Sequence, residues 1–240
     1  MNKKVLWLIT ARSGSKSILH KNIKPLEGMP LLAYRIKSAL SIAAPENVWV
    51  STDSEEYAEI SQSYGAIVPF LRPPELSGDT ASSIQVVIHA MEFAALHGAN
   101  YDAIGLLEPT SPLITFNQLS EAVQNLFSYE EAENIVACRI ARPHSFFVQN
   151  NDKYLAVLAN RFEKNAQLRR QDRKDEITPS GGFYIGKWDP FLQNKTFYTV
   201  KTLSFLVSEL NGLEIDEPID WNWAEYLIKN QIVKPSDIFK

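Results

Sequence analysis

Apolar residues follow two alternating patterns along this chain. Short continuous apolar runs predict buried strands, and they lie at 5–10, 47–51, 66–70, 101–107 and 134–138. The stretches between them place apolar residues three and four positions apart, which predicts helices at 31–43, 54–64, 82–97 and 116–128. Strands that alternate with helices favour parallel β-α-β units. We therefore expect an α/β fold whose sheet is mostly parallel and covered on both faces.

The pattern changes near Arg139. Two strand-like runs flank a polar turn and predict a hairpin at 145–149 and 154–158, and a polar stretch rich in arginine follows. The regular pattern then returns, with strands expected at 182–186 and 213–215 and an amphipathic helix at 217–229. We therefore expect one domain formed by residues 1–138 and 180–240, with an inserted arm at 139–179.

Composition narrows the function classes. The 240 residues include 24 Lys and Arg against 28 Asp and Glu, a net charge of −4, which argues against a nucleic-acid partner. Cys138 is the single cysteine, so no internal disulfide forms. The apolar runs fall short of the ~20 residues of a membrane span, and the start lacks the features of a signal peptide. We expect a cytoplasmic protein with no membrane partner.

The segment 11–17, Ala-Arg-Ser-Gly-Ser-Lys-Ser, follows the first predicted strand. Ligands of open α/β sheets bind beyond the carboxyl ends of strands. Arg12, Lys16 and Lys21 supply positive charge there, and Gly14 and small serines such as Ser15 let backbone N–H groups approach an anion. The spacing is neither that of a Walker loop nor that of a dinucleotide fingerprint. It indicates a triphosphate site, with a solvated basic turn as the alternative.

A second polar segment follows the predicted strand at 66–70. Arg72 lies there beside two prolines that stiffen its loop. Asp79 or Thr80 could cap the next helix, which begins near Ser83. A binding role and a purely structural loop remain equally open for this segment.

Two further sites involve carboxylates. Glu108 follows the strand at 101–107, where a carboxylate is costly unless it is hydrogen-bonded, and the alternative is a helix-start turn capped by Ser111 and Pro112. Glu214 and Asp216 are two positions apart on a predicted strand, so they share one face. Such a pair beside phosphates suits Mg²⁺, although surface carboxylates are the more common explanation.

A triphosphate site, a metal pair and a crevice together predict nucleotidyl transfer. At these residues the sequence resembles the acylneuraminate cytidylyltransferase family, the CMP-sialic acid synthetases. The resemblance rests on seven segments: 11–23 (ARSGSKSILHKNI), 50–54 (VSTDS), 70–76 (FLRPPEL), 79–84 (DTASSI), 106–113 (LLEPTSPL), 182–185 (GFYI) and 213–216 (LEID). It implies a Rossmann-like, three-layer nucleotidyltransferase sheet.

The resemblance also implies a reaction and a set of roles. CTP and a nine-carbon 2-keto sugar acid would give a CMP-sugar and pyrophosphate, without a covalent intermediate. The implied contacts are Arg12, Ser15, Lys16 and Lys21 for the phosphates, Asn22, Arg72 and Ser83 for cytosine and ribose, Asp216 and Glu214 for Mg²⁺, and Glu108, Tyr184, Phe197 and Tyr198 for the sugar. Arg12, Lys21 and Asp216 are the candidate catalytic residues.

The arm in such enzymes crosses to a second subunit, which implies a homodimer and makes Arg169 or Arg170 a candidate for the sugar carboxylate. This sequence departs from the family where Glu108 replaces a frequent Gln and Glu214 replaces a frequent Asp. Because a carboxylate only accepts hydrogen bonds, Glu108 suggests a sugar with extra donors, such as legionaminic acid.

Two alternatives remain. One is a cytidylyltransferase for Kdo, or a nucleotidyltransferase for another sugar, whose motifs differ from those above. The other is a nucleotide-binding protein that has lost catalysis, for which tight CTP binding without pyrophosphate release would be the sign.

Overall fold

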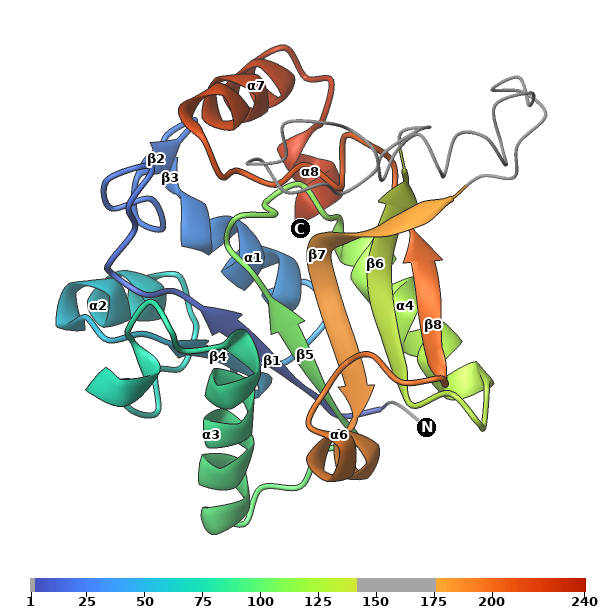
Figure 1. Ribbon diagram of the computed structural model, residues 1–240. Coiled ribbons are helices and arrows are strands. Elements are labelled where there is room, and N and C mark those ends of the chain that lie inside the picture. Colours follow the sequence, from blue (N-terminus) through green and yellow to red (C-terminus); the bar gives the residue numbers. More distant parts are fainter. Residues whose placement is uncertain (1–2, 142–175) are drawn as a thin grey trace, which may run out of the picture.

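The computed structural model describes residues 3–141 and 176–240, and its centre is a six-stranded sheet in the order β4-β1-β5-β7-β6-β8 (Figure 1). The strands are β1 Val5–Thr10, β4 Val48–Ser51, β5 Ala103–Leu107, β6 Asn134–Ile140, β7 Ile177–Lys187 and β8 Thr202–Leu206. Strand β7 runs antiparallel to β5 and β6, and all other neighbouring pairs are parallel. The expected α/β fold with a mostly parallel sheet is confirmed.

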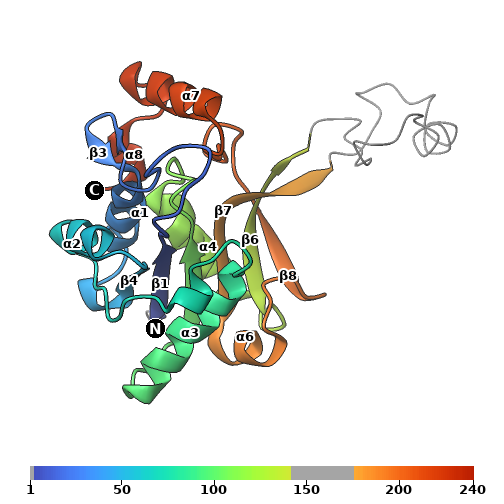
Figure 2. The same ribbon diagram turned by 60° about the vertical axis from the view of Figure 1, so that its left-hand side comes forward.

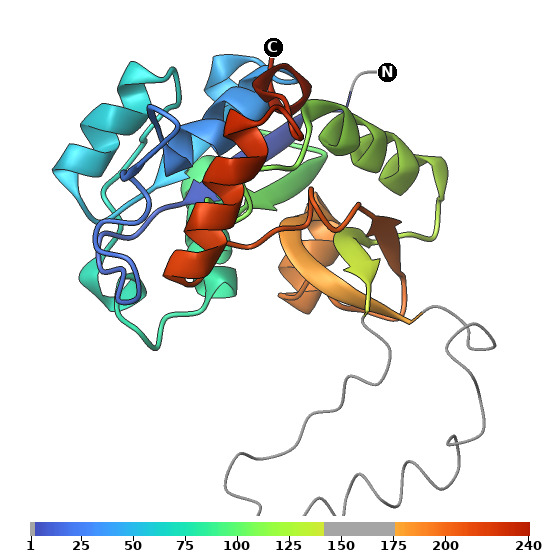
Figure 3. The same ribbon diagram turned by 90° about the horizontal axis from the view of Figure 1, so that it is seen from above.

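Alternation along β1 explains the layers of the fold. Trp7 and Ile9 lie in the core shared with α1 (Leu31–Leu40), α2 (Glu55–Ser63) and α4 (Phe116–Ser128). Leu6 and Leu8 lie in the core shared with α3 (Ser83–Leu96) and α6 (Trp188–Asn194). Successive strand side chains point to opposite faces, so one apolar run serves both cores. Figure 3 shows the two groups of helices on opposite sides of the sheet.

A third apolar cluster lies at the carboxyl end of the sheet. It joins α7 (Pro218–Lys229) and α8 (Pro235–Ile238) to a small hairpin of β2 (Pro25–Leu26) and β3 (Met29–Pro30). Trp221 and Leu227 of α7 are buried against Leu26 and Leu31 in this cluster. Helix α7 therefore lies across the carboxyl ends of the parallel strands (Figures 1, 2 and 3).

Capping side chains decide where the helices begin. Ser54 accepts a hydrogen bond from the Tyr57 backbone N–H and caps α2. Ser82 caps α3 and forms a capping box with Gln85, so neither Asp79 nor Thr80 is the cap that the sequence suggested. In α4 the same box is formed by Thr115 and Gln118, and the predicted alternative caps Ser111 and Pro112 lie upstream of it.

Two of the expected strands are wrong. The segment 66–70 makes only isolated parallel bridges, at Ile67 with Trp49 and at Leu71 with Thr52. The segment 213–215 forms no strand, and its Ile215 N–H donates to the Thr110 carbonyl at 2.7 Å. Strand β8 and helix α6 were missed. In β8, TLSFL, only Phe205 is buried, and the mixture of polar and apolar residues gives no continuous apolar run.

The expected hairpin at 145–149 and 154–158 lies outside the described residues, as does most of the expected arm. Strand β6 continues to Ile140 and β7 begins at Ile177, so the two ends of the arm enter the sheet as paired neighbours. Cys138 is buried at 4% exposure, as expected of a core residue. Across the described ranges, no helix combines the length and the apolar character that crossing a membrane requires.

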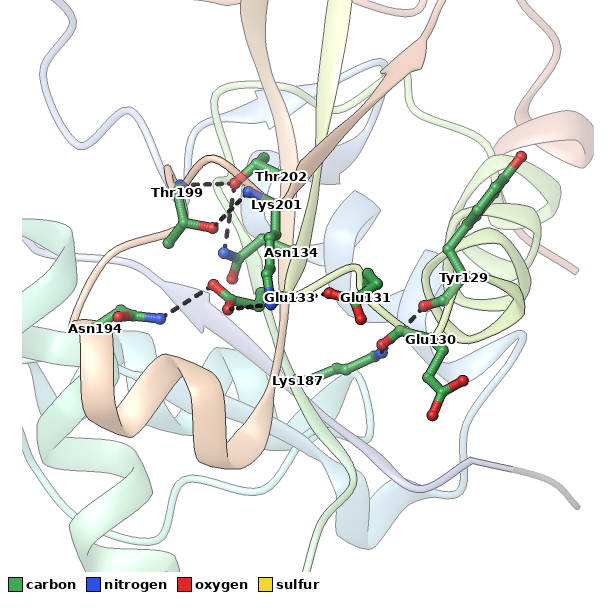
Figure 4. Close-up of polar contacts among 10 residues, drawn as sticks. All are labelled: Tyr129, Glu130, Glu131, Glu133, Asn134, Lys187, Asn194, Thr199, Lys201 and Thr202. Carbon is green, nitrogen blue, oxygen red and sulfur yellow. Dashed lines mark hydrogen bonds and ion pairs between the residues drawn. The ribbon is translucent and has the colours of Figure 1, made fainter.

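Polar contacts join the segments at the end of the sheet that lies opposite α7 (Figure 4). The Lys187 ammonium donates to the backbone carbonyls of Tyr129 at 3.2 Å and Glu130 at 2.9 Å, just past the end of α4. Lys201 lies 3.1 Å from the Glu131 carboxylate and 3.9 Å from that of Glu133. These contacts join the turn after α4 to the end of β7 and to the start of β8, so this network has a structural role.

Candidate active site

A cavity of about 430 Å³ lies at the carboxyl ends of β1 and β5, beside the segment that precedes α7. This is the edge at which open α/β sheets bind ligands. It is lined by Thr10, Arg12, Ser15, Lys16, Ser17, Lys21, Asn22, Glu108, Pro109, Thr110, Glu214 and Asp216. The tertiary structure thus brings eight of the predicted site residues from three distant segments to one cavity.

The cationic side of the cavity is the loop that follows β1, residues 11–24. Arg12 donates to one Asp79 carboxylate oxygen at 2.9 Å, and the Lys16 ammonium lies 2.6 Å from the other. The hydrogen bond from Lys16, followed by that from Arg12, holds the pKa of Asp79 below its ordinary value. Two of the cations expected to meet phosphates therefore bind the same carboxylate, that of Asp79.

Lys21 links the loop to the segment before α7. Its ammonium donates to the Ile215 backbone carbonyl at 2.8 Å and lies 3.6 Å from an Asp216 carboxylate oxygen. The Ser17 hydroxyl donates to the Asp216 backbone carbonyl. Only 11% of the Lys21 side chain is exposed, whereas Asp216 is 69% exposed and open to a ligand. These bonds keep a buried cation beside an accessible carboxylate.

The opposite side of the cavity is acidic. Burial raises the pKa of Glu108, and the Ser83 hydroxyl, which donates to it at 3.2 Å, partly offsets that rise. Burial also raises the pKa of Glu214, and the nearby charges of Asp216 and Glu108 raise it further. A group of like charges at a partly buried site is stabilised by a cation, because the cation removes their mutual repulsion.

Glu214 and Asp216 suit a hard divalent cation in the chemistry of their oxygen atoms. In the ranges 3–141 and 176–240, no group of three or more His, Cys, Asp or Glu side chains forms a complete metal site. Mg²⁺ commonly takes one or two carboxylates and completes its shell with substrate phosphates and water. The two residues therefore fit a cation that enters together with a phosphorylated ligand.

Glu214 is fixed by the backbone opposite it. Gly181 adopts a φ of +61°, and a Cβ atom at that position would lie 2.5 Å from a Glu214 carboxylate oxygen. A side chain there would be strained and would displace the carboxylate. The strand expected at 182–186 did not include Gly181, and the close approach of Gly181 to Glu214 depends on two segments far apart in the sequence.

The predicted aromatic residues form a cluster beside Glu108. The Tyr184 ring centroid lies 5.5 Å from that of Phe197 and 6.3 Å from that of Tyr198. Burial raises the pKa of Tyr184, with a further rise from the charge of Glu108. Phe197 is 2% exposed and belongs to the core, whereas Tyr198 is 53% exposed. Phe197 therefore packs on the core side of the cluster, and Tyr198 lies on its exposed side.

Of the remaining residues predicted to bind the ligands, some line the cavity and others do not. Asn22 lines the cavity, and its amide donates to the Arg12 backbone carbonyl at 2.9 Å. Arg72 does not line the cavity; its guanidinium binds the Ser51 hydroxyl and backbone carbonyl. Burial lowers the Arg72 pKa to about 10. The positions 169 and 170 lie outside the described residues, so those two predictions stay untested.

Sequence reasoning missed three polar residues of the loop region. Ser17 and Thr110 line the cavity, and Asp53 binds the loop from outside through Ser13. Asp53 lies directly before Ser54, the cap of α2, and that position in the sequence favours helix capping over a contact with the loop. Its contact with Ser13 depends on the pairing of β1 with β4, which a single sequence does not display.

The fold has a recognisable class. The structure of a CMP-2-keto-3-deoxy-manno-octonic acid synthetase complexed with CTP superposes with a TM-score of 0.67 at 17% identity, over 95% of this chain and 99% of that one. At that identity the likeness concerns the fold, which is that of a nucleotidyltransferase.

The family follows from the sequence comparison. The profile of the Cytidylyltransferase family matches residues 6–227, and this chain belongs to that family. N-acylneuraminate cytidylyltransferase of Escherichia coli O18:K1:H7 is 33% identical over 224 residues, 93% of this chain and 52% of that protein. This chain thus spans about half of the Escherichia coli enzyme. Pseudaminic acid cytidylyltransferase of Campylobacter jejuni is 31% identical over 229 residues, 94% of this chain and 97% of its own length.

Proposed function

We propose that this protein transfers CMP from CTP to the anomeric hydroxyl of a nine-carbon 2-keto sugar acid, a nonulosonic acid. The anomeric hydroxyl oxygen forms a bond to the α-phosphorus as its O–H bond breaks, the bond from that phosphorus to the bridging oxygen breaks, and pyrophosphate leaves. The released proton passes to pyrophosphate or to water. The observation that carries the proposal is the cavity in which Arg12, Lys16 and Lys21 face Glu214 and Asp216. Family membership supports the same reaction class.

The residues of the cavity have separate roles in this proposal. Arg12, Lys16 and Lys21 neutralise the triphosphate, with Ser15 beside them in the loop. Neutralising and positioning a transferring phosphoryl group supplies most of the catalysis in reactions of this kind. When bound, Mg²⁺ would be held by Asp216 and Glu214 and would add charge stabilisation at the phosphates. We propose that Asn22 and Ser83 contact the ribose and the base.

We propose for Arg72 a supporting role in place of the expected contact with cytosine or ribose. Its guanidinium is engaged with Ser51 and is buried. We propose that it supports the end of β4, next to the nucleotide, by holding the strand backbone. Direct contact with cytosine would require those bonds to be exchanged.

In this proposal the sugar binds on the side of Glu108. We propose that Glu108, Tyr184 and Tyr198 contact the sugar, with Phe197 packed beneath them. Aromatic residues with hydroxyl groups give apolar area and a polar end, which suits the acyl and hydroxyl groups of a nonulosonic acid. A carboxylate at 108 accepts hydrogen bonds only, which favours a sugar of the legionaminic type over N-acetylneuraminic acid.

The assembly and the location of the reaction are also proposals. Strands β6 and β7 pair beside each other at the base of the inserted segment, so that segment leaves and re-enters the domain at one place. We propose that residues 139–179 form an arm that binds a second copy of the chain, giving a homodimer. Arg169 or Arg170 would then meet the sugar carboxylate. The single cysteine suits a reducing compartment such as the cytoplasm.

A pyrophosphate-release assay with CTP and Mg²⁺ tests the proposed reaction. The substrate panel contains N-acetylneuraminic, Kdn, legionaminic, pseudaminic and Kdo acids. We expect turnover with a nine-carbon acid and the highest kcat/KM with legionaminic acid. Turnover with Kdo alone would assign the protein to the alternative reaction. CTP binding without turnover on any acid would favour the non-catalytic alternative.

A further inference from the structure

The peptide that joins Arg12 to Ser13 is held by side chains on both of its polar groups. The Ser13 N–H donates to Asp53 Oδ1 at 2.8 Å, and the Asn22 amide donates to the Arg12 carbonyl at 2.9 Å. The Ser13 hydroxyl adds a bond to Asp53 Oδ2 at 3.0 Å. Because a peptide unit is planar, fixing its N–H and its C=O fixes its orientation.

Asp53 is itself placed by the sheet. Strands β1 and β4 pair so that Thr10 lies opposite Ser51, and the Ala11 N–H donates to the Ser51 carbonyl at 3.0 Å. The two strands therefore end side by side, and the residues that follow them meet. Since Ser54 caps α2, the Asp53 carboxylate does not serve as the helix cap and is directed to Ser13 instead.

Arg72 also fixes the position of Asp53, because it binds the two residues that precede it. Its guanidinium holds the Ser51 hydroxyl at 3.0 Å, and its backbone N–H donates to the Thr52 carbonyl at 2.7 Å. Burial disfavours the positive charge of Arg72, and the negative charge of Asp53 opposes that effect. The segment 51–53 is thus anchored on one side and binds the loop on the other.

We propose that Asp53 is a positioning residue that fixes the peptide between Arg12 and Ser13 and so directs the Arg12 guanidinium toward the nucleotide phosphates. The proposal deepens the proposed function and rests on it, since it assumes that CTP is the ligand of the cavity. Asp53 does not line the cavity and acts through the loop. Small displacements of a positioned group cost on the order of 10²-fold in rate, so the contact has a measurable effect.

Three substitutions at this position separate geometry from charge. Asp53→Ala removes both bonds to Ser13. Asp53→Asn keeps an acceptor for the Ser13 N–H but removes the charge, and Asp53→Glu keeps the charge but moves it by one methylene. Asp102→Ala is the matched control. Asp102 also accepts from a backbone N–H and an adjacent side chain, those of Lys4 and Lys3, at the other edge of the sheet.

Calorimetric titration with CTP and Mg²⁺, without a sugar acid, gives the first measurement. We expect Asp53→Ala and Asp53→Glu to weaken CTP binding by about tenfold to a hundredfold, because Arg12 loses its alignment. We expect Asp53→Asn to stay within about threefold of the wild type, since its amide oxygen can still accept from Ser13. Asp102→Ala should lower the melting temperature and leave CTP affinity unchanged.

Steady-state kinetics of pyrophosphate release adds a measurement that a purely structural role would not alter. We expect the KM for CTP to rise in Asp53→Ala while the KM for the sugar acid stays constant. CTP affinity of Asp53→Ala equal to that of the wild type would overturn the proposal. Equal losses in Asp53→Asn and Asp53→Ala would overturn it in favour of a charge effect. If Asp53→Ala fails to fold, the comparison of the Asn and Glu variants decides.

The outcomes also separate this proposal from the proposed function. Wild-type protein that binds CTP but turns over no sugar acid refutes the transfer reaction, and the binding series still tests Asp53. Wild-type protein that turns over a sugar acid and is unaffected by Asp53→Ala refutes only the role of Asp53. Wild-type protein that does not bind CTP refutes both.

Discussion

The Lys21 ammonium lies 3.6 Å from the Asp216 carboxylate, although the two residues come from opposite ends of the chain. Lys21 is nearly buried and Asp216 is exposed, so the pair presents an accessible carboxylate whose position is set by a fixed cation. The bond from Lys21 to the Ile215 carbonyl ties the same segment to the loop after β1. Lys21 and Asp216 both line the cavity, so this contact joins the loop after β1 to the segment before α7 in its wall.

The first prediction concerns Asp216. Asp216→Asn keeps the size of the side chain but removes the charge that we assign to the metal. We expect kcat/KM for pyrophosphate release to fall on the order of 10²- to 10³-fold, the usual cost of losing a charge-stabilising group. The melting temperature should change little, because the side chain is 69% exposed.

The control for that experiment is Glu121→Gln, which removes an exposed carboxylate from α4. It should retain the wild-type kcat/KM at every Mg²⁺ concentration. Full activity of Asp216→Asn across a Mg²⁺ titration would show that another group holds the cation.

The second prediction concerns Asp79. Its carboxylate binds both Arg12 and Lys16, so phosphates that bind these two cations must displace it. Exposed ion pairs are weak, and their removal has small effects. We therefore expect Asp79→Asn to bind CTP about two- to fivefold more tightly at low ionic strength, with a smaller gain at high salt.

Titration calorimetry at two salt concentrations checks this expectation. Asp189→Asn, an exposed position on α6, serves as the control for the general loss of one negative charge. Weaker CTP binding by Asp79→Asn would mean that Asp79 contacts the nucleotide or the metal directly and does not compete with the phosphates.

The third prediction concerns Glu108 and pH. Burial raises its pKa in the folded protein above the ordinary value of 4.5, so the folded state binds the proton more tightly than the unfolded state. The contribution of Glu108 to stability is therefore greatest below pH 4.5 and is lost as the pH rises through the raised pKa. The charges that act on it most strongly are those of Asp216, Lys21 and Arg35.

Glu108→Gln removes this titration. We expect the variant to be more stable than the wild type at neutral pH and to lose that advantage in acid, as measured by urea unfolding across a pH series. Glu59→Gln, an exposed site on α2, should follow the wild-type curve. A constant difference at every pH would show that Glu108 does not titrate in that range.

The fourth prediction concerns the core. A Cβ atom on Gly105 would lie 2.5 Å from the ring of Trp7, which faces it across the β1–β5 ladder. Overpacking of this kind costs about 1–3 kcal/mol, so Gly105→Ala should lower the free energy of unfolding by that amount. Gly78→Ala is the control, since no neighbouring atom lies within 4 Å of the Cβ it adds. Equal stability of the two variants would contradict the packing argument.

The sequence predicted the main elements because their signals are local. An apolar run bounded by polar residues is visible without the fold, and β1 and α4 have the bounds expected of them. The failure at 66–70 is instructive. Its composition favours a strand, but only Ile67 and Leu71 meet a partner, and pairing is a property of two segments.

The candidate site likewise has features that are visible in the sequence and features that arise only in the tertiary structure. The sequence by itself determined the residue types, because a cationic loop after β1 and the carboxylates Glu108, Glu214 and Asp216 are visible as local patterns. The tertiary structure decided which of them face one cavity. It placed Glu214 against Gly181 and turned Arg72 toward Ser51.

Asp53 shows the physical reason for that division. Its neighbours in the chain predict a helix cap, whereas its actual partner, Ser13, follows a different strand. Propensity and capping act over a few residues, so a sequence displays them directly. Contacts between loops depend on strand order and register, which arise only when distant segments pack into one sheet.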